Sequence, residues 1–76
     1  MIKKLYSFNN KRMIQKRIEI GLTFKELSER TGLTEVALWK MENAKTVPNP
    51  KTINKVAKAL GIRPDDLVSY NGNQHK

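Results

Sequence analysis

The chain has 76 residues and a formal charge of +8, because fifteen lysine and arginine residues outnumber seven aspartate and glutamate residues. Its length allows one small domain near the lower limit for a stable core. Its charge favours nucleic acid, or less specifically an anionic membrane surface, as a partner. The absence of cysteine excludes a disulfide framework and cysteine-based zinc sites. No apolar run has the length of a membrane span, and the first residues lack the apolar region of a signal peptide, so we expect a cytoplasmic protein.

Residues 1–8 mix apolar and basic side chains and form an N-terminal arm. This composition suits a brief strand, a segment packed across the core or a flexible basic arm, and we favour the packed segment. The reason is the order Phe8, Asn9 and Met13, which predicts a helix N-cap at Asn9 with a hydrophobic staple between the other two residues. A helix is predicted to follow over residues 10–20.

One face of this first helix combines Met13, Arg17 and Ile20, which share a side by helical spacing. An arginine on a buried stripe needs a partner, and the best candidate in the chain is Glu42. The alternative is that the arginine extends along its aliphatic stem to reach solvent. Spacing alone supports the two interpretations equally.

The centre of the chain, residues 22–45, predicts two short helices joined by a tight turn. Thr23 and Glu26 form a capping box that opens the first of these helices, near Thr23–Thr31. Gly32 ends it, because glycine adopts the left-handed conformation after a helix without steric cost.

The second helix of this stretch is predicted from Thr34, its N-cap, to about Asn43. Leu38 and Met41 lie three residues apart and form its buried stripe. The side chains left pointing elsewhere are Glu35, Val36, Trp39 and Lys40. A short helix, a glycine turn and a capped second helix together make a helix-turn-helix pattern.

Two more helices are predicted after a short linker. Asn49 and Pro50 combine a cap residue with proline at the first helical position, so the next helix begins there and ends before Gly61. A last short helix begins near Pro64, and a frayed polar tail follows from Ser69. The sequence therefore predicts an all-α, five-helix domain over residues 9–68, between an arm of residues 1–8 and a tail of residues 69–76.

These features together resemble the Cro/C1-type helix-turn-helix family of small regulators, which includes lambdoid phage repressors and Cro proteins. The order and spacing of the shared residues are more specific than any one of them, and the match runs from Phe8 to Val68. The shared residues are Arg17, Gly21, Leu22, Thr23, Glu26, Leu27, Gly32, Leu38, Met41, Glu42, Asn43, Lys45, Pro48, Ala57 to Gly61, Asp66 and Leu67. The resemblance implies a five-helix DNA-binding fold. Since some of these repressors have a buried arginine–glutamate pair at the corresponding places, it also favours pairing of Arg17 with Glu42.

By the same resemblance, the helix from Thr34 is the recognition helix, whose first residues meet base edges in the major groove. Lysine can donate to guanine, glutamate can accept from cytosine, and small apolar side chains can pack against thymine methyl groups. Tryptophan is unusual at its position, which is commonly polar in the family; it either stacks on sugar or base edges or folds back over the core. The residues expected to read bases are Glu35, Val36, Ala37, Trp39 and Lys40.

Phosphate contacts are expected at helix N-termini and in the loop after the recognition helix. Phe24 occupies a place where the family often has glutamine, so only its backbone N–H is available. Ala44 replaces a frequent glycine, which predicts a tighter or differently angled turn. Lys51 and Lys55 are either a solvated face or an additional contact. The residues expected to contact phosphate are Thr23, Phe24, Asn43, Lys45 and Thr46.

Two functions from different classes remain open. The first is a sequence-specific DNA-binding regulator, in our hypothesis a repressor, that binds a palindromic operator in double-stranded DNA as a homodimer. The second is a protein-interaction module on the same fold, such as an antitoxin, that binds a partner protein through Val36 and Trp39. The net charge and the family resemblance favour the first function.

Neither hypothesis requires catalysis, a metal or another cofactor. The one histidine, His75, lies in the predicted tail, so no catalytic set can be assembled around it. For the homodimer we expect a surface made by the last helix and the tail, with the N-terminal arm and the first helix as the runner-up. The residues concerned are Leu67, Val68 and Tyr70 in the first surface, and Ile14 and Ile18 in the second.

Overall fold

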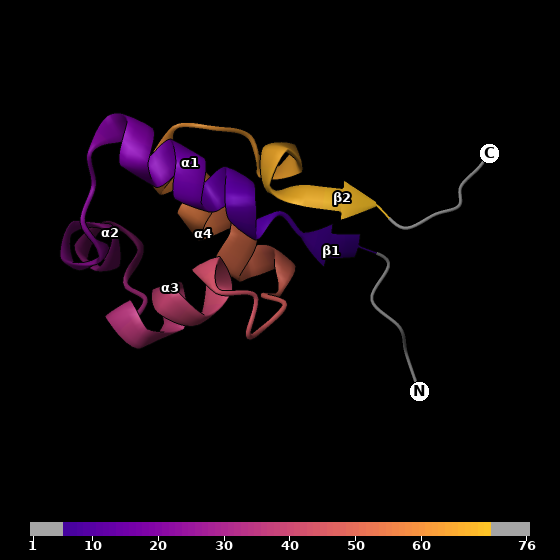
Figure 1. Cartoon of the computed structure of the whole chain (residues 1–76), viewed down its shortest axis with the longest axis horizontal. Helices are drawn as coiled ribbons and strands as arrows, with labels where there is room; N and C mark the ends of the chain where they lie inside the picture. The colour runs from indigo at the N-terminus through magenta and orange to yellow at the C-terminus, as the bar shows by residue number, and fades with distance from the viewer. Residues whose placement is uncertain (1–5, 71–76) are drawn as a thin grey trace.

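Within residues 6–70, four α-helices enclose one core, and a two-stranded ribbon projects beyond them at one end of the domain (Figure 1). This is a computed structural model, and it describes residues 6–70. The elements in chain order are β1 (Tyr6–Phe8), α1 (Asn10–Ile20), α2 (Phe24–Thr31), α3 (Glu35–Glu42), α4 (Pro50–Leu60), the 3-10 helix η1 (Pro64–Leu67) and β2 (Val68–Tyr70).

The helices begin where their N-cap residues predict. Each cap side chain accepts a hydrogen bond from a backbone N–H of the first turn, which would otherwise have no partner in the helix. At α1, α3 and α4 the donor–acceptor distances are 3.1, 3.0 and 2.9 Å, and at α2 the complete capping box is present. The caps are Asn9, Thr23, Thr34 and Asn49. The predicted starts of all four α-helices are therefore confirmed to within one residue.

The core lies between α4 and the other helices. Every helix contributes to it, and α4 contributes most because its apolar residues recur at three-to-four spacing along one side. The buried apolar residues are Met13, Leu22, Leu27, Leu38, Met41, Ile53, Val56, Ala57, Leu60 and Leu67. Truncating a fully buried leucine of this kind to alanine typically costs about 2–5 kcal/mol, which is a large part of the stability of a domain of this size.

The prediction of an all-α domain with five helices is wrong in two respects. The fifth helix is a single 3-10 turn of four residues, because the chain becomes extended at Val68, with φ −131° and ψ 152°. The second difference is the antiparallel ribbon, in which Tyr6 pairs with Tyr70, Ser7 with Ser69 and Phe8 with Val68. A brief strand was one of three possibilities for the arm, but its partner lies at the other end of the domain.

The prediction of a frayed tail from Ser69 is wrong for Ser69 and Tyr70, which form β2 with Val68. Residues 71–76, including His75, lie outside the described residues. Residues directly opposite in an antiparallel pair share a face, so Phe8 and Val68 both pack against the core. This burial, together with the alternation of apolar and serine residues in each strand, accounts for the ribbon.

Candidate nucleic-acid interface

The turn between α2 and α3 is fixed by two side chains of α2. The Ser28 hydroxyl donates to the Leu33 carbonyl at 2.5 Å, and the Thr31 hydroxyl accepts from the Leu33 N–H at 3.1 Å. Gly32 between them has φ +77°, a left-handed conformation that favours glycine. The start of α3 is therefore attached to the end of α2 through both polar groups of one backbone residue.

The outward face of α3 has the residues that the sequence predicts to read bases. Glu35 and Lys40 are exposed, and Val36 and Trp39 are 63% and 47% exposed. Ala37 is half-buried beside them. Because about half of the Trp39 side chain is exposed, its ring is not buried in the core. These five residues offer one carboxylate, one ammonium group and three apolar side chains on two helical turns.

An open groove of about 420 Å³ lies beside this face, between α3 and the loop that leads to α4. Val36, Ala37 and Lys40 line one side of it, and Thr46 and Val47 line the other. Val47, which is 45% exposed, has no role among those predicted from the sequence. The signal that could have identified it is an apolar residue in a polar linker, directly before a proline.

The turn after α3 has the hydrogen bonds of a Schellman motif. The Lys45 N–H donates to the Lys40 carbonyl at 2.8 Å, and the Ala44 N–H donates to the Met41 carbonyl at 3.3 Å. Ala44 has φ +57°, so it adopts the left-handed conformation usually taken by glycine. The expected tighter or differently angled turn is therefore wrong, because alanine here accepts the glycine geometry.

The residues of this turn differ in what they can offer a phosphate. The Asn43 side-chain N–H donates to the Trp39 carbonyl at 2.9 Å, so one of its donors already caps α3. Lys45 and Thr46 are exposed, and neither side chain has a hydrogen-bond or ion-pair partner among residues 6–70. Lys45 and Thr46 are thus the freer groups, and Asn43 stabilises the end of the helix.

The N-terminus of α2 already has an anionic partner. The Glu26 carboxylate accepts from the Thr23 backbone N–H at 2.9 Å and from its hydroxyl at 3.2 Å. The backbone hydrogen bond and then the hydroxyl bond lower the pKa of Glu26, so the carboxylate is charged at neutral pH. This negative charge at the N-terminus of α2 disfavours contact between Thr23 and a phosphate group.

The side chain of Phe24 contacts Arg17 of α1. The Arg17 guanidinium carbon lies 4.4 Å from the centroid of the Phe24 ring, and the ring is half-buried against the core. Arg17 donates to the Glu42 carboxylate through Nε at 2.5 Å and Nη2 at 3.1 Å. Its Nη1 donates to the Leu22 carbonyl at 2.9 Å. We refer to Arg17, Leu22, Phe24 and Glu42 as the Arg17 cluster.

The structure thus brings together Arg17 and Glu42, the pair expected from the sequence. The exposed fractions of the two side chains are 17% and 5%, so the pair is largely shielded from water. A two-point contact between a guanidinium and a carboxylate fixes orientation as well as distance. Glu42 is the last residue of α3, so the pair connects α1 to the C-terminal end of that helix.

Residues 6–70 contain no group of three or more acidic, histidine or cysteine side chains placed to bind a metal ion. None of the helices in this range is long and apolar enough to cross a membrane.

Over residues 13–67 the sequence matches the HTH_3 family of helix-turn-helix proteins. The restriction-modification controller protein C.AhdI from Aeromonas hydrophila is similar in structure, with 26% identity and a TM-score of 0.72 over 75% of this chain and 86% of that chain. The P22 c2 repressor, solved in complex with a synthetic operator, has 25% identity and a TM-score of 0.71 over 78% of this chain and 89% of that chain.

A transcriptional regulator of the HTH_3 family from Vibrio cholerae also shares the fold, with a TM-score of 0.71 and 21% identity. The match covers 76% of this chain but only 33% of that chain. At this identity the likeness concerns the fold alone.

Proposed function

The chain belongs to the HTH_3 family, the Cro/C1-type helix-turn-helix proteins, and on this premise we propose that it is a repressor that binds a palindromic operator as a homodimer. Membership in a family of non-enzymatic transcription regulators agrees with the absence of catalysis that the sequence predicts. The P22 c2 repressor, similar over most of its length, was crystallised on an operator, which supports the same role here. We expect the protein to act in the cytoplasm.

The observation that supports this proposal most directly is the outward face of α3. It presents Glu35, Val36, Trp39 and Lys40 to solvent beside a groove, at the place where the fold reads base edges. Lys45, which has no hydrogen-bond or ion-pair partner among residues 6–70, follows the helix where the DNA backbone would pass. We assign base reading to α3 and positioning on phosphate to Lys45 and Thr46, with smaller contributions from Asn43, Thr23 and the backbone N–H of Phe24.

For the homodimer we propose the ribbon and the groove that it forms with α4 and η1. One helix-turn-helix reads few base pairs, and a two-fold pair reads two half-sites. Leu67 is fully buried in the core and is removed from the predicted surface, whereas Tyr70 is 70% exposed. Ile18, of the runner-up surface, is also 63% exposed.

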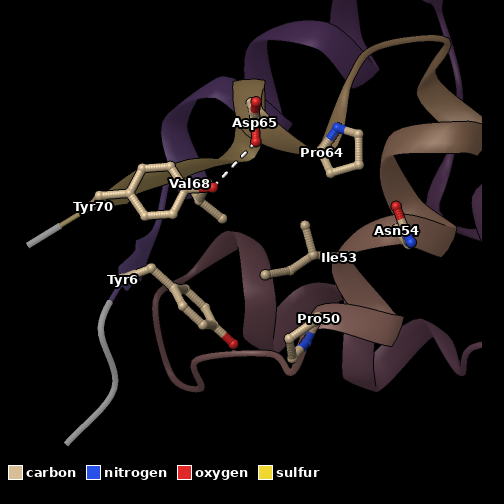
Figure 2. A pocket seen from close by; sticks show the side chains of 8 residues that line it. All are labelled: Tyr6, Pro50, Ile53, Asn54, Pro64, Asp65, Val68 and Tyr70. Atoms are coloured by element: carbon tan, nitrogen blue, oxygen red, sulfur yellow. Dashed lines mark hydrogen bonds between the residues drawn. The ribbon is translucent and has the colours of Figure 1, made fainter.

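Figure 2 shows the groove, with Tyr6 and Tyr70 on the ribbon side and Ile53 on the α4 side. Its volume is about 290 Å³, and among the residues that the structure describes Asp65 is the one charged residue that lines it. The Tyr70 hydroxyl donates to Asp65 at 3.2 Å, which raises the pKa of Tyr70. In a chain of charge +8, a groove whose described lining residues include no lysine or arginine is a place where two copies repel each other weakly.

The proposal is tested by measuring binding to a selected duplex and to a random duplex at several salt concentrations. Binding should weaken steeply as salt rises, and Lys45→Ala should weaken binding to both duplexes and reduce the slope by roughly one unit. Lys40→Ala or Glu35→Ala should change sequence preference, by about 1–3 kcal/mol for each lost base contact. Lys58→Ala, an exposed lysine in the last turn of α4, is the matched control.

The assignment of base reading to α3 and of phosphate contact to Lys45 would be contradicted if Lys45→Ala changed sequence preference while Lys40→Ala and Glu35→Ala did not. Sedimentation that finds a monomer both free and on the selected duplex would exclude the homodimer.

A second candidate function rests on the exposed apolar side chains Val36, Trp39 and Val47 beside one groove. Such a patch also suits a protein partner, as in an antitoxin. Binding to duplexes that is absent, or that does not depend on salt, would favour this alternative.

A further inference from the structure

α3 is fixed at both ends by polar contacts from other helices. At its start, Ser28 and Thr31 of α2 bind both backbone groups of Leu33. At its end, the carboxylate of Glu42 binds Arg17 of α1, and the Glu42 carbonyl accepts from the Asn10 side chain at 2.9 Å. Because α3 has only eight residues, these two attachments set its tilt against the rest of the domain.

The second attachment depends on the orientation of one guanidinium group. Arg17 uses three of its nitrogen atoms on two partners, Glu42 and the Leu22 carbonyl. A long arginine side chain has many rotamers, and its planar fork makes these bonds together only in one orientation. The Phe24 ring stacks against the guanidinium at 4.4 Å and covers it on that side.

We propose that Phe24 is a positioning residue for sequence recognition: by stacking on Arg17 it fixes Glu42, and through Glu42 the tilt of α3. This inference rests on the proposed function in DNA binding. Hydrogen bonds to base edges weaken with small changes of distance and angle, so a change of tilt removes base contacts. Long lysine side chains adjust to phosphate, so contacts to the DNA backbone survive the same change.

The test compares two apolar replacements with one aromatic replacement. Phe24→Leu and Phe24→Met keep an apolar side chain but remove the ring face, whereas Phe24→Tyr keeps it. A duplex selected from a randomised pool by the natural protein serves as the specific probe, and an unselected duplex serves as the non-specific probe. Both affinities are measured well below the thermal midpoint of every variant.

In Phe24→Leu and Phe24→Met the ratio of specific to non-specific affinity should fall by about tenfold, the size of one lost base contact. The non-specific affinity should change much less than the specific affinity, because every variant keeps the backbone N–H at this position, and Phe24→Tyr should keep the ratio of the natural protein. Ile62→Ala is the control for general loss of packing, because Ile62 packs against the same core outside the Arg17 cluster. This variant should lower the thermal midpoint and leave the ratio unchanged.

A lower thermal midpoint with an unchanged ratio in Phe24→Leu and Phe24→Met would overturn the inference and leave the proposed function intact. A natural protein that enriches no duplex from the pool would overturn both.

Discussion

Each of the two turns that flank α3 contains one residue with a left-handed φ, but the residues and their hydrogen bonds differ. The turn before it has Gly32 at φ +77°, and the turn after it has Ala44 at φ +57°. The first turn is attached by neutral hydrogen bonds to Leu33, and the second lies beside the ion pair of the Arg17 cluster. The backbone after α3 is therefore more strained than the backbone before it, because alanine adopts a left-handed φ there. The position of this end of α3 also depends on the charge of Arg17, which lies on another helix.

The strongest test of this comparison removes the charge pair. Arg17→Met alone or Glu42→Gln alone should lower the free energy of unfolding by about 3–5 kcal/mol, because each leaves a partly or fully buried partner without its counter-charge. The double variant should recover part of this loss. Urea unfolding of all four proteins measures the coupling.

Glu19→Gln is the matched control, since Glu19 pairs with Lys16 at 2.8 Å on the exposed side of α1. Its effect should be much smaller, as is usual for surface pairs. Losses that simply add in the double variant would show that Arg17 and Glu42 do not interact.

A smaller effect is expected at the first turn. Gly32→Ala should lower the free energy of unfolding by about 1–2 kcal/mol, the usual cost of a left-handed conformation for a residue with a Cβ atom. No heavy atom lies within 4 Å of the added Cβ, so the backbone alone causes the loss. Chemical denaturation gives the value, and an unchanged stability would show that the turn can adopt another conformation.

The second turn should respond in the opposite direction. Ala44→Gly should raise the free energy of unfolding by about 0.5–1 kcal/mol, because removal of the Cβ relieves the left-handed strain and glycine entropy offsets part of the gain. The shift of the urea midpoint at constant slope measures it. A loss of stability in Ala44→Gly would mean that the two turns are not equivalent in backbone strain.

The smallest expected effect is the pH dependence of the capping box that Thr23 and Glu26 form at the start of α2. The pKa of Glu26 is lowered in the folded state, so its stabilisation is present above the unfolded value, about 4.5, and is lost as the pH falls through the folded value. Glu26→Gln should therefore be less stable than the natural protein at neutral pH, with a difference that shrinks in acid. Thermal unfolding across this range tests it; a constant difference would contradict the assignment.

The sequence was sufficient for the features that depend on near neighbours. The N-caps Asn9, Thr23, Thr34 and Asn49 are adjacent in sequence to the helices that they begin, so the starts of these helices could be predicted. The outward direction of Glu35, Val36, Trp39 and Lys40 followed from helical periodicity.

Features that depend on distant residues could not be predicted in the same way. The ribbon joins segments at the two ends of the domain, and three-residue strands have too little pattern to reveal their pairing. The role of the Phe24 ring depends on Arg17, which belongs to another helix. From the sequence, phenylalanine in place of the family's glutamine indicated only the loss of a polar contact.

The ribbon has a consequence for the order of folding. Its Ser7–Ser69 contact joins residues 62 positions apart, so it closes a loop that contains almost the whole domain and its entropic cost is high. The helices form through local contacts, which need little loop closure. We therefore expect the ribbon to form last and to open first in hydrogen exchange. The groove of Tyr6 and Tyr70 would then exist only in the completed domain, so that partially folded chains would lack the surface through which we propose that two copies associate.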